Sequence, residues 1–230
     1  MRTAATEQRT RVKQSHLGNR LLRLPQPSLA MTINNTENRK LKTGLFFGSY
    51  NPIHTGHLVI ANYMANHTGL DEVWLVVSPH NPLKEKSGLA NMYDRLEMAN
   101  LAIESSENIR ISDIEFNLPK PSYTIDTLTY LHEKFPSKEF VLIMGADNLV
   151  SFKKWKNYEV LLKDYQIYVY PRPSADVNEW KDHPSIVFTD TPLMEISSTF
   201  IRKSIKERKN VQFFLPDKVI SFIDSKGMYL

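Results

Sequence analysis

Cysteine is absent from this chain of 230 residues. Disulfides, zinc–thiolate sites and thiol nucleophiles are therefore excluded, so any chemistry must use other side chains. No apolar run approaches the roughly 18 residues needed to cross a bilayer, and the N-terminus lacks the continuous apolar segment of a secretory signal. The remaining composition, with 41% apolar and 23% charged residues, is typical of a globular protein. Together these features predict a cytoplasmic protein that does not bind membranes.

Glycine is scarce as well, with eight residues in the chain. The sequence contains neither G-x-G-x-x-G nor G-x-x-x-x-G-K-[ST], which excludes the common dinucleotide fingerprint and the Walker loop. A nucleotide phosphate would therefore need a different turn between a strand and a helix.

Net positive charge is concentrated at the start of the chain. Residues 1–42 hold nine Lys and Arg against two Glu, a net charge of +7, whereas the whole chain carries +4 and residues 43–230 therefore carry −3. The first segment shows no helical or strand period, so we predict a disordered basic extension; an organelle transit peptide and an upstream start before Met31 are alternatives. Residues 43–230 are predicted to form a single domain. Their weakly acidic charge predicts no nucleic-acid partner and suits a small phosphate ligand held by a few cations.

From Thr43 onward, short apolar runs alternate with amphipathic segments, which predicts an α/β fold with a parallel sheet. The expected strands are Gly44–Phe47, Glu72–Ser78, Ile109–Ile114, Phe140–Met144, Gln166–Tyr170 and Ile186–Phe188. The expected helices are Gly56–Asn66, Ala90–Glu104, Thr124–Lys134, Asn157–Lys163, Ser198–Lys206 and Asp217–Ser225. Asp94 and Arg95, at the start of the long second helix, are interpreted as structural.

The first strand runs into a turn that contains two histidines. Residues 44–57 read G-L-F-F-G-S-Y-N-P-I-H-T-G-H, so that His54 and His57 flank the start of the next helix. Gly56 lets a ligand approach the backbone closely, and the N-terminus of a helix offers unpaired N–H groups to a phosphate. Histidine N–H donors can also reach phosphoryl oxygens that gain charge during transfer. An ordinary loop before a capped helix is the alternative.

Residues 47–57 resemble the signature G-G-T-F-D-P-x-H-x-G-H of the nucleotidyltransferase superfamily, with four departures: Phe47 replaces the first Gly, Ser49 replaces Thr, Tyr50 replaces Phe and Asn51 replaces Asp. Asn51 cannot carry a negative charge, although its amide can still donate and accept hydrogen bonds. The second signature of that superfamily, I-S-S-T-x-I-R, is intact at residues 196–202. There a serine can cap a helix whose N–H groups face phosphate, and Arg202 follows Ser198 by one turn. A capped surface helix with a solvated arginine is the alternative.

Four further segments are similar to the nicotinate-nucleotide adenylyltransferases within that superfamily. They are P-H-N-P-L-K at residues 79–84, P-S-Y-T-I-D-T-L at 121–128, G-A-D at 145–147 followed by Trp155, and Y-P-R-P at 170–173. The resemblance covers about residues 43–230. It implies a Rossmann-like, doubly wound sheet with a small C-terminal helical part, and adenylyl transfer from ATP to nicotinate mononucleotide. It also implies Mg²⁺ held mainly through the ATP phosphates, with no metal site in the protein itself, and leaves a homo-oligomer open.

The resemblance assigns site residues in three groups. The catalytic group is His54, His57 and Arg202; the ATP and phosphate group is Gly48, Ser49, Asn51, Lys84, Asp147, Ser197, Ser198 and Thr199; and the nicotinate-nucleotide group is Tyr123, Thr124 and Trp155.

Structural alternatives stay open for several of these positions. Lys84 can equally be a solvated loop lysine, Trp155 a surface aromatic residue, and Tyr123, Thr124 and Asp147 helix caps. Arg172 either lies on the adenine side of the ATP site or has a purely structural role. Another adenylyl- or cytidylyltransferase, such as a phosphopantetheine adenylyltransferase, and a non-catalytic nucleotide sensor on the same fold are the alternative functions.

Overall fold

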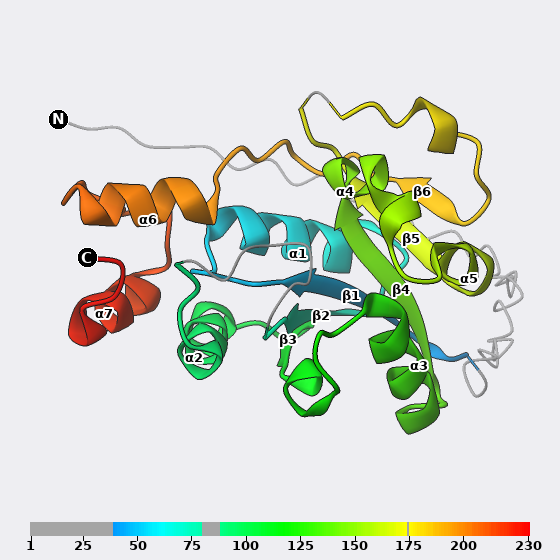
Figure 1. Cartoon of the computed structure of the whole chain (residues 1–230), viewed down its shortest axis with the longest axis horizontal. Coiled ribbons are helices and arrows are strands. Elements are labelled where there is room, and N and C mark those ends of the chain that lie inside the picture. The colour runs from blue at the N-terminus through cyan, green and yellow to red at the C-terminus, as the bar shows by residue number, and fades with distance from the viewer. Residues whose placement is uncertain (1–38, 80–87, 174) are drawn as a thin grey trace, which may run out of the picture. The chain divides into compact units, whose positions relative to one another are not determined.

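Six parallel strands form the sheet of the computed structural model, which describes residues 39–79, 88–173 and 175–230. The order across the sheet is β3-β2-β1-β4-β5-β6 (Figure 1). The chain thus starts in the middle, builds outward to one edge, and returns to build the other half, which is a doubly wound arrangement. The strands are β1 (Leu41–Gly48), β2 (Glu72–Val77), β3 (Ile109–Ser112), β4 (Lys138–Gly145), β5 (Gln166–Tyr170) and β6 (Ile186–Phe188).

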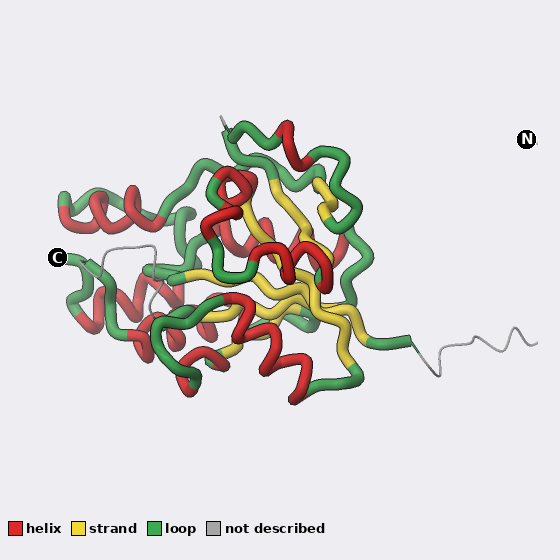
Figure 2. Tube along the Cα trace, turned by 45° about the vertical axis from the view of Figure 1, so that its right-hand side comes forward, coloured by secondary structure: helices red, strands yellow, loops and turns green. Residues whose placement is uncertain are grey.

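Helices cover both faces of this sheet (Figure 2). The α-helices are α1 (Thr55–His67), α2 (Met92–Ile103), α3 (Thr124–Lys134), α4 (Ala146–Val150), α5 (Tyr158–Asp164), α6 (Ser198–Lys206) and α7 (Asp217–Lys226). Short 3₁₀ turns, η1 (Ile114–Asn117), η2 (Phe152–Lys154) and η3 (Asn178–Trp180), connect some of them. No helix of the described residues is long and apolar enough to cross a bilayer.

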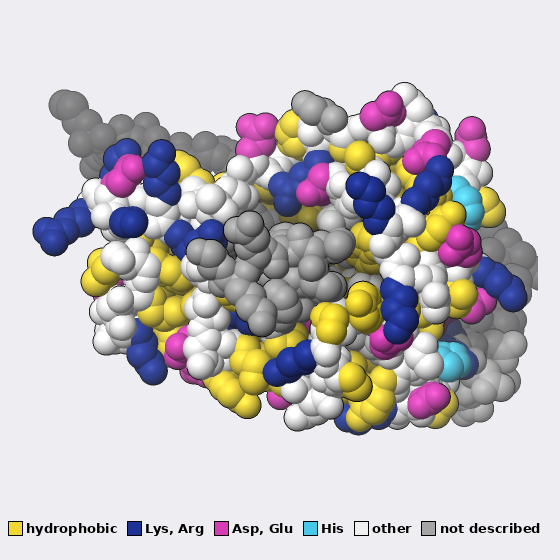
Figure 3. Space-filling view, in the orientation of Figure 1, with side chains coloured by type: hydrophobic (Ala, Val, Ile, Leu, Met, Phe, Trp, Pro, Cys, Tyr) yellow, Lys and Arg dark blue, Asp and Glu magenta, His cyan; other side chains and the backbone are white. Residues whose placement is uncertain are grey.

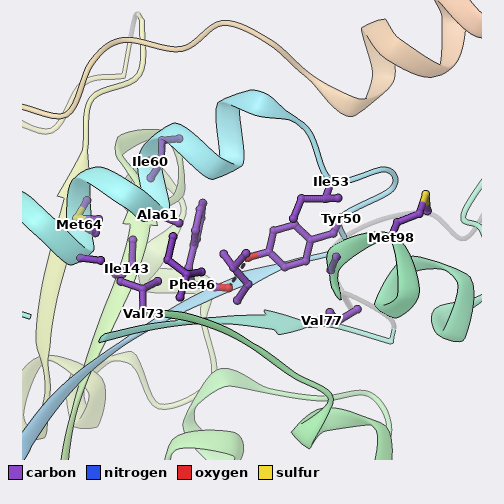
Figure 4. Close-up of a cluster of buried hydrophobic side chains, with 14 of the residues drawn as sticks. Phe46, Tyr50, Ile53, Ile60, Ala61, Met64, Val73, Val77, Met98 and Ile143 are labelled. Carbon is purple, nitrogen blue, oxygen red and sulfur yellow. Dashed lines mark hydrogen bonds between the residues drawn. The ribbon is translucent and has the colours of Figure 1, made fainter. Parts of the chain in front are cut away.

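Alternation along the strands produces two separate cores. In β4, Val141 and Ile143 join the core under α1, α2, α6 and α7, whereas Leu142 and Met144 join the core under α3, α4 and α5. Successive side chains of a strand point to opposite faces, so a strand that is apolar at every position must be covered on both sides. Figure 4 shows part of the first core, where Ile60 and Met64 of α1 lie near Ile143.

The two halves of the sheet meet between β1 and β4. Phe46 of β1 is paired with Ile143 of β4, and Gly48 and Gly145, the last residues of the two strands, each follow this pair by two residues. Ligands of doubly wound proteins bind at the carboxyl ends of the strands on either side of such a switch point. The fold therefore directs attention to the turns that follow Gly48 and Gly145.

The predicted α/β class, the six strands and the C-terminal helical part are confirmed. Several boundaries differ from the prediction by one to three residues. Leu41 and Lys42, which we assigned to the extension, belong to β1, and β3 ends at Ser112 because Ile114 already begins a 3₁₀ turn. The helix α4 was not predicted, since five residues are too few to show a helical period.

Candidate active site

The turn after β1 is built around the side chain of Tyr50. This residue has a left-handed backbone with a φ of 47°. Its ring folds back along the strand, and its hydroxyl donates a hydrogen bond to the Phe46 carbonyl at 2.5 Å (Figure 4). Gly48 is required here because a Cβ atom at that position would lie 2.7 Å from the Tyr50 ring. The buried tyrosine thereby sets the path of the chain toward the two histidines.

His54 and His57 lie together at the start of α1. His54 is the N-cap residue, and its ring stacks on that of His57 with the centroids 3.6 Å apart. The backbone N–H of His54 donates to Nδ1 of His57 at 3.3 Å, so a neutral His57 carries its proton on Nε2. Gly56 allows the stacking, because a Cβ atom there would lie 3.1 Å from the His54 ring. The H-x-G-H spacing thus brings two imidazoles to one helix N-terminus.

The environment of His54 keeps its ring neutral. Burial, assisted by the positive charge of Arg172, lowers the pKa of His54 to about 4. Its Nδ1 atom is buried and has no hydrogen-bond partner among the described residues. At pH 7 this imidazole is therefore an uncharged donor or acceptor.

The second motif lies directly against the first. Ser197 is the N-cap of α6, where its Oγ accepts a hydrogen bond from the backbone N–H of Phe200 at 3.2 Å. Ser198, the next residue, donates its hydroxyl hydrogen to the Pro52 carbonyl at 2.9 Å. The predicted capping is therefore confirmed for Ser197, while Ser198 joins two segments that are 146 residues apart in the sequence.

Arg202 makes a second bridge between the two motifs. Its Nη1 donates to the Asn51 carbonyl at 2.8 Å, and its Nη2 lies 3.3 Å from the Thr199 hydroxyl oxygen. The side chain is half-buried. The guanidinium predicted to hold phosphate therefore lies at the histidine turn.

Beyond β4, Asp147 and Arg172 face each other. Their closest side-chain atoms, Asp147 Oδ1 and Arg172 Nε, are 3.8 Å apart, and the guanidinium also lies 5.1 Å from the centre of the Tyr170 ring. Nη1 of Arg172 donates to the Met194 carbonyl at 2.8 Å. Because the same arginine acts on the pKa of His54, it belongs to the neighbourhood of the first motif. The sequence alone leaves open whether Arg172 is an adenine-side or a structural residue.

The three residues predicted to hold the nicotinate ring lie at the start of α3 and just after η2. Tyr123 is the N-cap of α3, Thr124 is its first residue, and Trp155 directly follows η2. Lys156 connects the two segments: its ammonium lies 4.8 Å from the centre of the Tyr123 ring and 2.8 Å from a carboxylate oxygen of Asp126. We had not predicted a role for this lysine, although it directly follows Trp155.

Two polar atoms near these residues have no partner. The hydroxyl of Ser122 and the indole Nε1 of Trp155 are both buried without a hydrogen bond among the described residues. Buried donors of this kind are normally satisfied, so these two atoms are exceptions among the described residues.

Arg95 supports the site from behind. Its side chain is fully buried in α2, and its guanidinium donates to four main-chain carbonyls at 2.5–3.1 Å, those of Ser49, Ser78, Pro79 and Ala90. One side chain thereby joins the turns that follow β1 and β2. This arrangement confirms the structural interpretation of Arg95.

Not every predicted residue can be placed. Lys84 lies outside the described residues. A cavity of about 550 Å³ is lined by residues of α5 and of the segment before β6, including Tyr158, Trp180 and His183, and contains none of the predicted site residues.

Motifs and fold together define a class of protein, the nucleotidyltransferases, whose two sequence signatures meet here at the switch point of the sheet. In agreement, the model of the cytidylyltransferase-like family matches residues 45–204.

Comparison with individual proteins narrows the class. A protein of Flavobacterium johnsoniae is 56% identical over 191 residues, and one of Flavobacterium psychrophilum is 54% identical over 191 residues. Each alignment covers 82% of this chain and 99% of the relative, and both relatives carry the name "Probable nicotinate-nucleotide adenylyltransferase". The chain belongs to the nicotinate-nucleotide adenylyltransferase family.

A solved structure shows the same fold. It is the nicotinic acid mononucleotide adenylyltransferase of Plasmodium falciparum complexed with NaAD, which superposes with a TM-score of 0.70 at 20% identity. The alignment covers 82% of this chain and 97% of that chain.

Proposed function

We propose that this chain transfers the adenylyl group of ATP to nicotinate mononucleotide, forming nicotinate adenine dinucleotide and pyrophosphate in NAD biosynthesis. The observation that carries this proposal is the direct contact between the two phosphate motifs, through the hydrogen bonds from Ser198 to the Pro52 carbonyl and from Arg202 to the Asn51 carbonyl. The activity named for the relatives supports the same reaction.

The reaction needs neither a general base nor a covalent intermediate. The phosphate of nicotinate mononucleotide is ionised at pH 7, so one of its oxygens can attack the α-phosphorus of ATP. A new P–O bond forms while the bond from the α-phosphorus to the bridging oxygen breaks, and pyrophosphate leaves with that electron pair. Catalysis therefore depends on positioning and charge stabilisation.

Each motif has a defined task in this mechanism. His57 donates a hydrogen bond to the α-phosphoryl oxygens as their charge changes, and the neutral His54 contributes a further polar contact. Arg202, with Ser198, binds the departing pyrophosphate. Asp147 accepts a hydrogen bond from a ribose hydroxyl of ATP. The remaining residues assigned to binding the ATP phosphates are Gly48, Ser49, Lys84, Ser197 and Thr199.

The acceptor binds on the other side of the switch point. Trp155 and Tyr123 provide aromatic faces for the pyridine ring, and the N–H and hydroxyl groups of Thr124 bind its carboxylate. Lys156, paired with Asp126, adds a cation beside Tyr123. These donors favour the acid over the uncharged amide, because an amide would leave them imperfectly paired.

Magnesium would neutralise charge on the ATP phosphates. Among the described residues, no group of three or more His, Asp or Glu side chains could hold a metal ion. Asp147, whose side chain is exposed, is the acidic residue at the end of β4. This donor set fits an ion that keeps most of its water and is held through phosphate oxygens.

Charge on α6 favours the approach of a polyanionic substrate. Lys203 and Lys206 follow Arg202 along the helix, and Arg208 and Lys209 lie just beyond it. Lys and Arg side chains gather over this helix in Figure 3. Glu207 pairs with Lys203 and Lys209, so this region carries an excess of positive charge, and such an excess raises the encounter rate with anionic ligands.

The proposal is tested by pyrophosphate release from ATP and Mg²⁺ with three acceptors offered separately: nicotinate mononucleotide, nicotinamide mononucleotide and phosphopantetheine. We expect strong preference for the nicotinate acceptor. Release with a different acceptor alone would overturn the assignment of the acceptor pocket, and no release with any of the three would favour a nucleotide sensor.

A further inference from the structure

The segment after α7 folds back onto the histidine turn. Gly227 ends the helix in a left-handed conformation with a φ of 59°, and Tyr229 is left-handed as well, with a φ of 68°. The hydroxyl of Tyr229 then donates a hydrogen bond to Oδ1 of Asn51 at 2.7 Å. Two residues that are 178 positions apart in the sequence thereby meet beside the phosphate motifs.

The backbone of Tyr229 is unfavourable by itself. A left-handed conformation raises the energy of a residue with a Cβ atom by about 1–2 kcal/mol, and it persists only where the surroundings hold it. Here the half-buried ring packs against the core under α2 and α7, and the hydroxyl binds Asn51. Strain of this kind is typical of residues with a functional task.

Asn51 is the point at which several segments join. Its Oδ1 accepts hydrogen bonds from the Tyr229 hydroxyl at 2.7 Å and from the backbone N–H of Ala90 at 3.2 Å. Its Nδ2 donates to the Gly88 carbonyl at 2.8 Å, and its own carbonyl accepts from Arg202. With two donors on Oδ1, the amide can face Gly88 only through its NH₂ group.

This network explains why asparagine stands where the superfamily signature has aspartate. An aspartate would direct a carboxylate oxygen at the Gly88 carbonyl, placing two acceptors opposite each other without a hydrogen between them. The asparagine side chain is 6% exposed and its Oδ1 is fully used within the protein. Asn51 is therefore suited to holding the turn.

We propose that Tyr229 is a positioning residue for adenylyl transfer, which acts through Asn51 to fix the turn that carries His54, His57 and the carbonyl bound by Arg202. This inference rests on the proposed function. Tyr229 touches Asn51, and Asn51 precedes His54 by three residues, so a looser amide would let the imidazoles and the guanidinium move relative to each other.

The surroundings keep the Tyr229 hydroxyl protonated and able to donate. Burial raises the pKa of Tyr229, and the positive charges of Arg202 and Arg95 offset only part of that rise. Asp94 is the acidic group that also acts on this phenol. The hydrogen bond to Asn51 is therefore present throughout the pH range in which an enzyme assay is run.

The test compares Tyr229→Phe, which keeps the ring and removes the hydroxyl, with Leu230→Ala as the matched control. Leu230 is 80% exposed and adjoins Tyr229, so its truncation changes the same segment without removing the hydrogen bond. For each variant we would measure kcat, both KM values, the affinity for ATP by calorimetry, and the melting temperature. We expect Tyr229→Phe to lower kcat about tenfold and to leave KM for nicotinate mononucleotide unchanged.

A double-mutant cycle identifies the route of the effect. If Tyr229 acts through Asn51, Tyr229→Phe should change kcat by less than about twofold when Asn51 is already Ala. Equal behaviour of Tyr229→Phe and Leu230→Ala in turnover and in ATP affinity would overturn the inference, as would additive effects in the cycle. A wild-type chain without turnover would instead refute the proposed reaction, and the ATP affinities of the two variants would then decide the role of Tyr229.

Discussion

Two histidines that lie three residues apart have different environments in this protein. His54 is 3% exposed and its pKa is lowered to about 4, whereas His57 is partly exposed and packs against Phe46 and Tyr50. The buried ring is held by the fold, and the more accessible ring is the better candidate for direct contact with the reacting phosphate. The consequences of replacing them should differ accordingly.

Replacing His57 by Ala should lower kcat about 100- to 1,000-fold, the usual effect of removing one donor to a developing charge. The melting temperature should fall by only about 2–4 °C, because the ring is partly exposed but also accepts a hydrogen bond from the backbone N–H of His54 at the start of α1. Steady-state kinetics and a thermal melt on the same preparation measure the two quantities.

His67→Ala is the control for this experiment, since His67 lies in the last turn of α1 and stacks on Tyr63. It should retain wild-type kcat. Loss of folded protein equal to the loss of activity in His57→Ala would make His57 a structural residue.

The low pKa of His54 should make the protein less stable in acid. The folded state binds the proton near pH 4 and the unfolded state near pH 6.5, so between these values the unfolded chain binds more protons. The free energy of unfolding should therefore be constant with respect to this group above about pH 6.5 and fall as the pH is lowered toward 4. His54→Asn should flatten that part of the curve of stability against pH.

Arg172 provides an independent check. Replacing it by Met removes the second cause of the shift and leaves burial, so the pKa of His54 should rise only part of the way toward 6.5. NMR titration of the His54 ring measures it. If the pKa of His54 in this variant returned fully to 6.5, the charge of Arg172, and not burial, would be the main cause of the lowered pKa.

The sequence predicted where these residues lie but not what holds them. Asn51, His54 and Arg202 stand in recognisable motifs, and it is the resemblance of those motifs to the nucleotidyltransferases that implies one shared site. The partners of Asn51 are main-chain groups of Gly88 and Ala90 and the hydroxyl of Tyr229. Contacts between residues so far apart in the chain leave no local pattern in the amino-acid sequence. The burial of the Arg95 guanidinium likewise leaves no pattern that the sequence alone would reveal.

Whole elements were predicted more accurately than their ends. The bounds of α3 and α6 match the prediction, because each shows a clear helical period and α6 also begins after the capping residue Ser197. β1 begins three residues earlier than expected because charged Lys42 interrupts the apolar pattern, although it pairs with Glu139 in the sheet. The apolar pattern of the sequence identifies a helix or strand, whereas backbone hydrogen bonding determines the residue at which it begins or ends.

At the scale of one helix, Gly56→Ala should separate helix stability from catalysis. The added Cβ would lie 3.1 Å from the His54 ring, which must then move by a few tenths of an ångström. Alanine favours a helix over glycine by up to about 1 kcal/mol, so the melting temperature should not fall. We expect kcat/KM to fall about tenfold.

Gly69→Ala is the matched control, because a Cβ atom there meets only the Tyr168 hydroxyl at an ordinary 3.8 Å. It should retain wild-type kinetics. If Gly56→Ala also kept full activity, the spacing between the His54 ring and the start of α1 would have no part in catalysis.

Over the whole molecule, the two edges of the sheet have different tasks. The carboxyl edge carries the motifs described above. Near the amino edge, the buried carboxylate of Glu72 accepts from Thr43 and pairs with Lys138 and Arg110. Burial acts to raise the pKa of Glu72, but hydrogen bonds from Lys138 and Thr43 hold it below the usual value. This network joins β1, β2, β3 and β4 far from the switch point.

Glu72→Gln should therefore lower stability without changing the chemistry. Loss of the charge leaves Lys138, which is 18% exposed, without its anionic partner, and we expect the free energy of unfolding to fall by about 2–3 kcal/mol. In a domain of this size that corresponds to a melting temperature about 5–10 °C lower. Activity per folded molecule should match the wild type.

Glu179→Gln, which breaks the exposed ion pair with Lys153, is the comparison, and it should shift stability by less than about 0.5 kcal/mol. Denaturant titration gives the stabilities, and kcat measured well below each melting temperature gives the activities. A lower kcat for folded Glu72→Gln would show that strain at the amino edge reaches the histidine turn through β1. The strand that starts beside Glu72 ends at Gly48, so this is the path by which the two edges would be coupled.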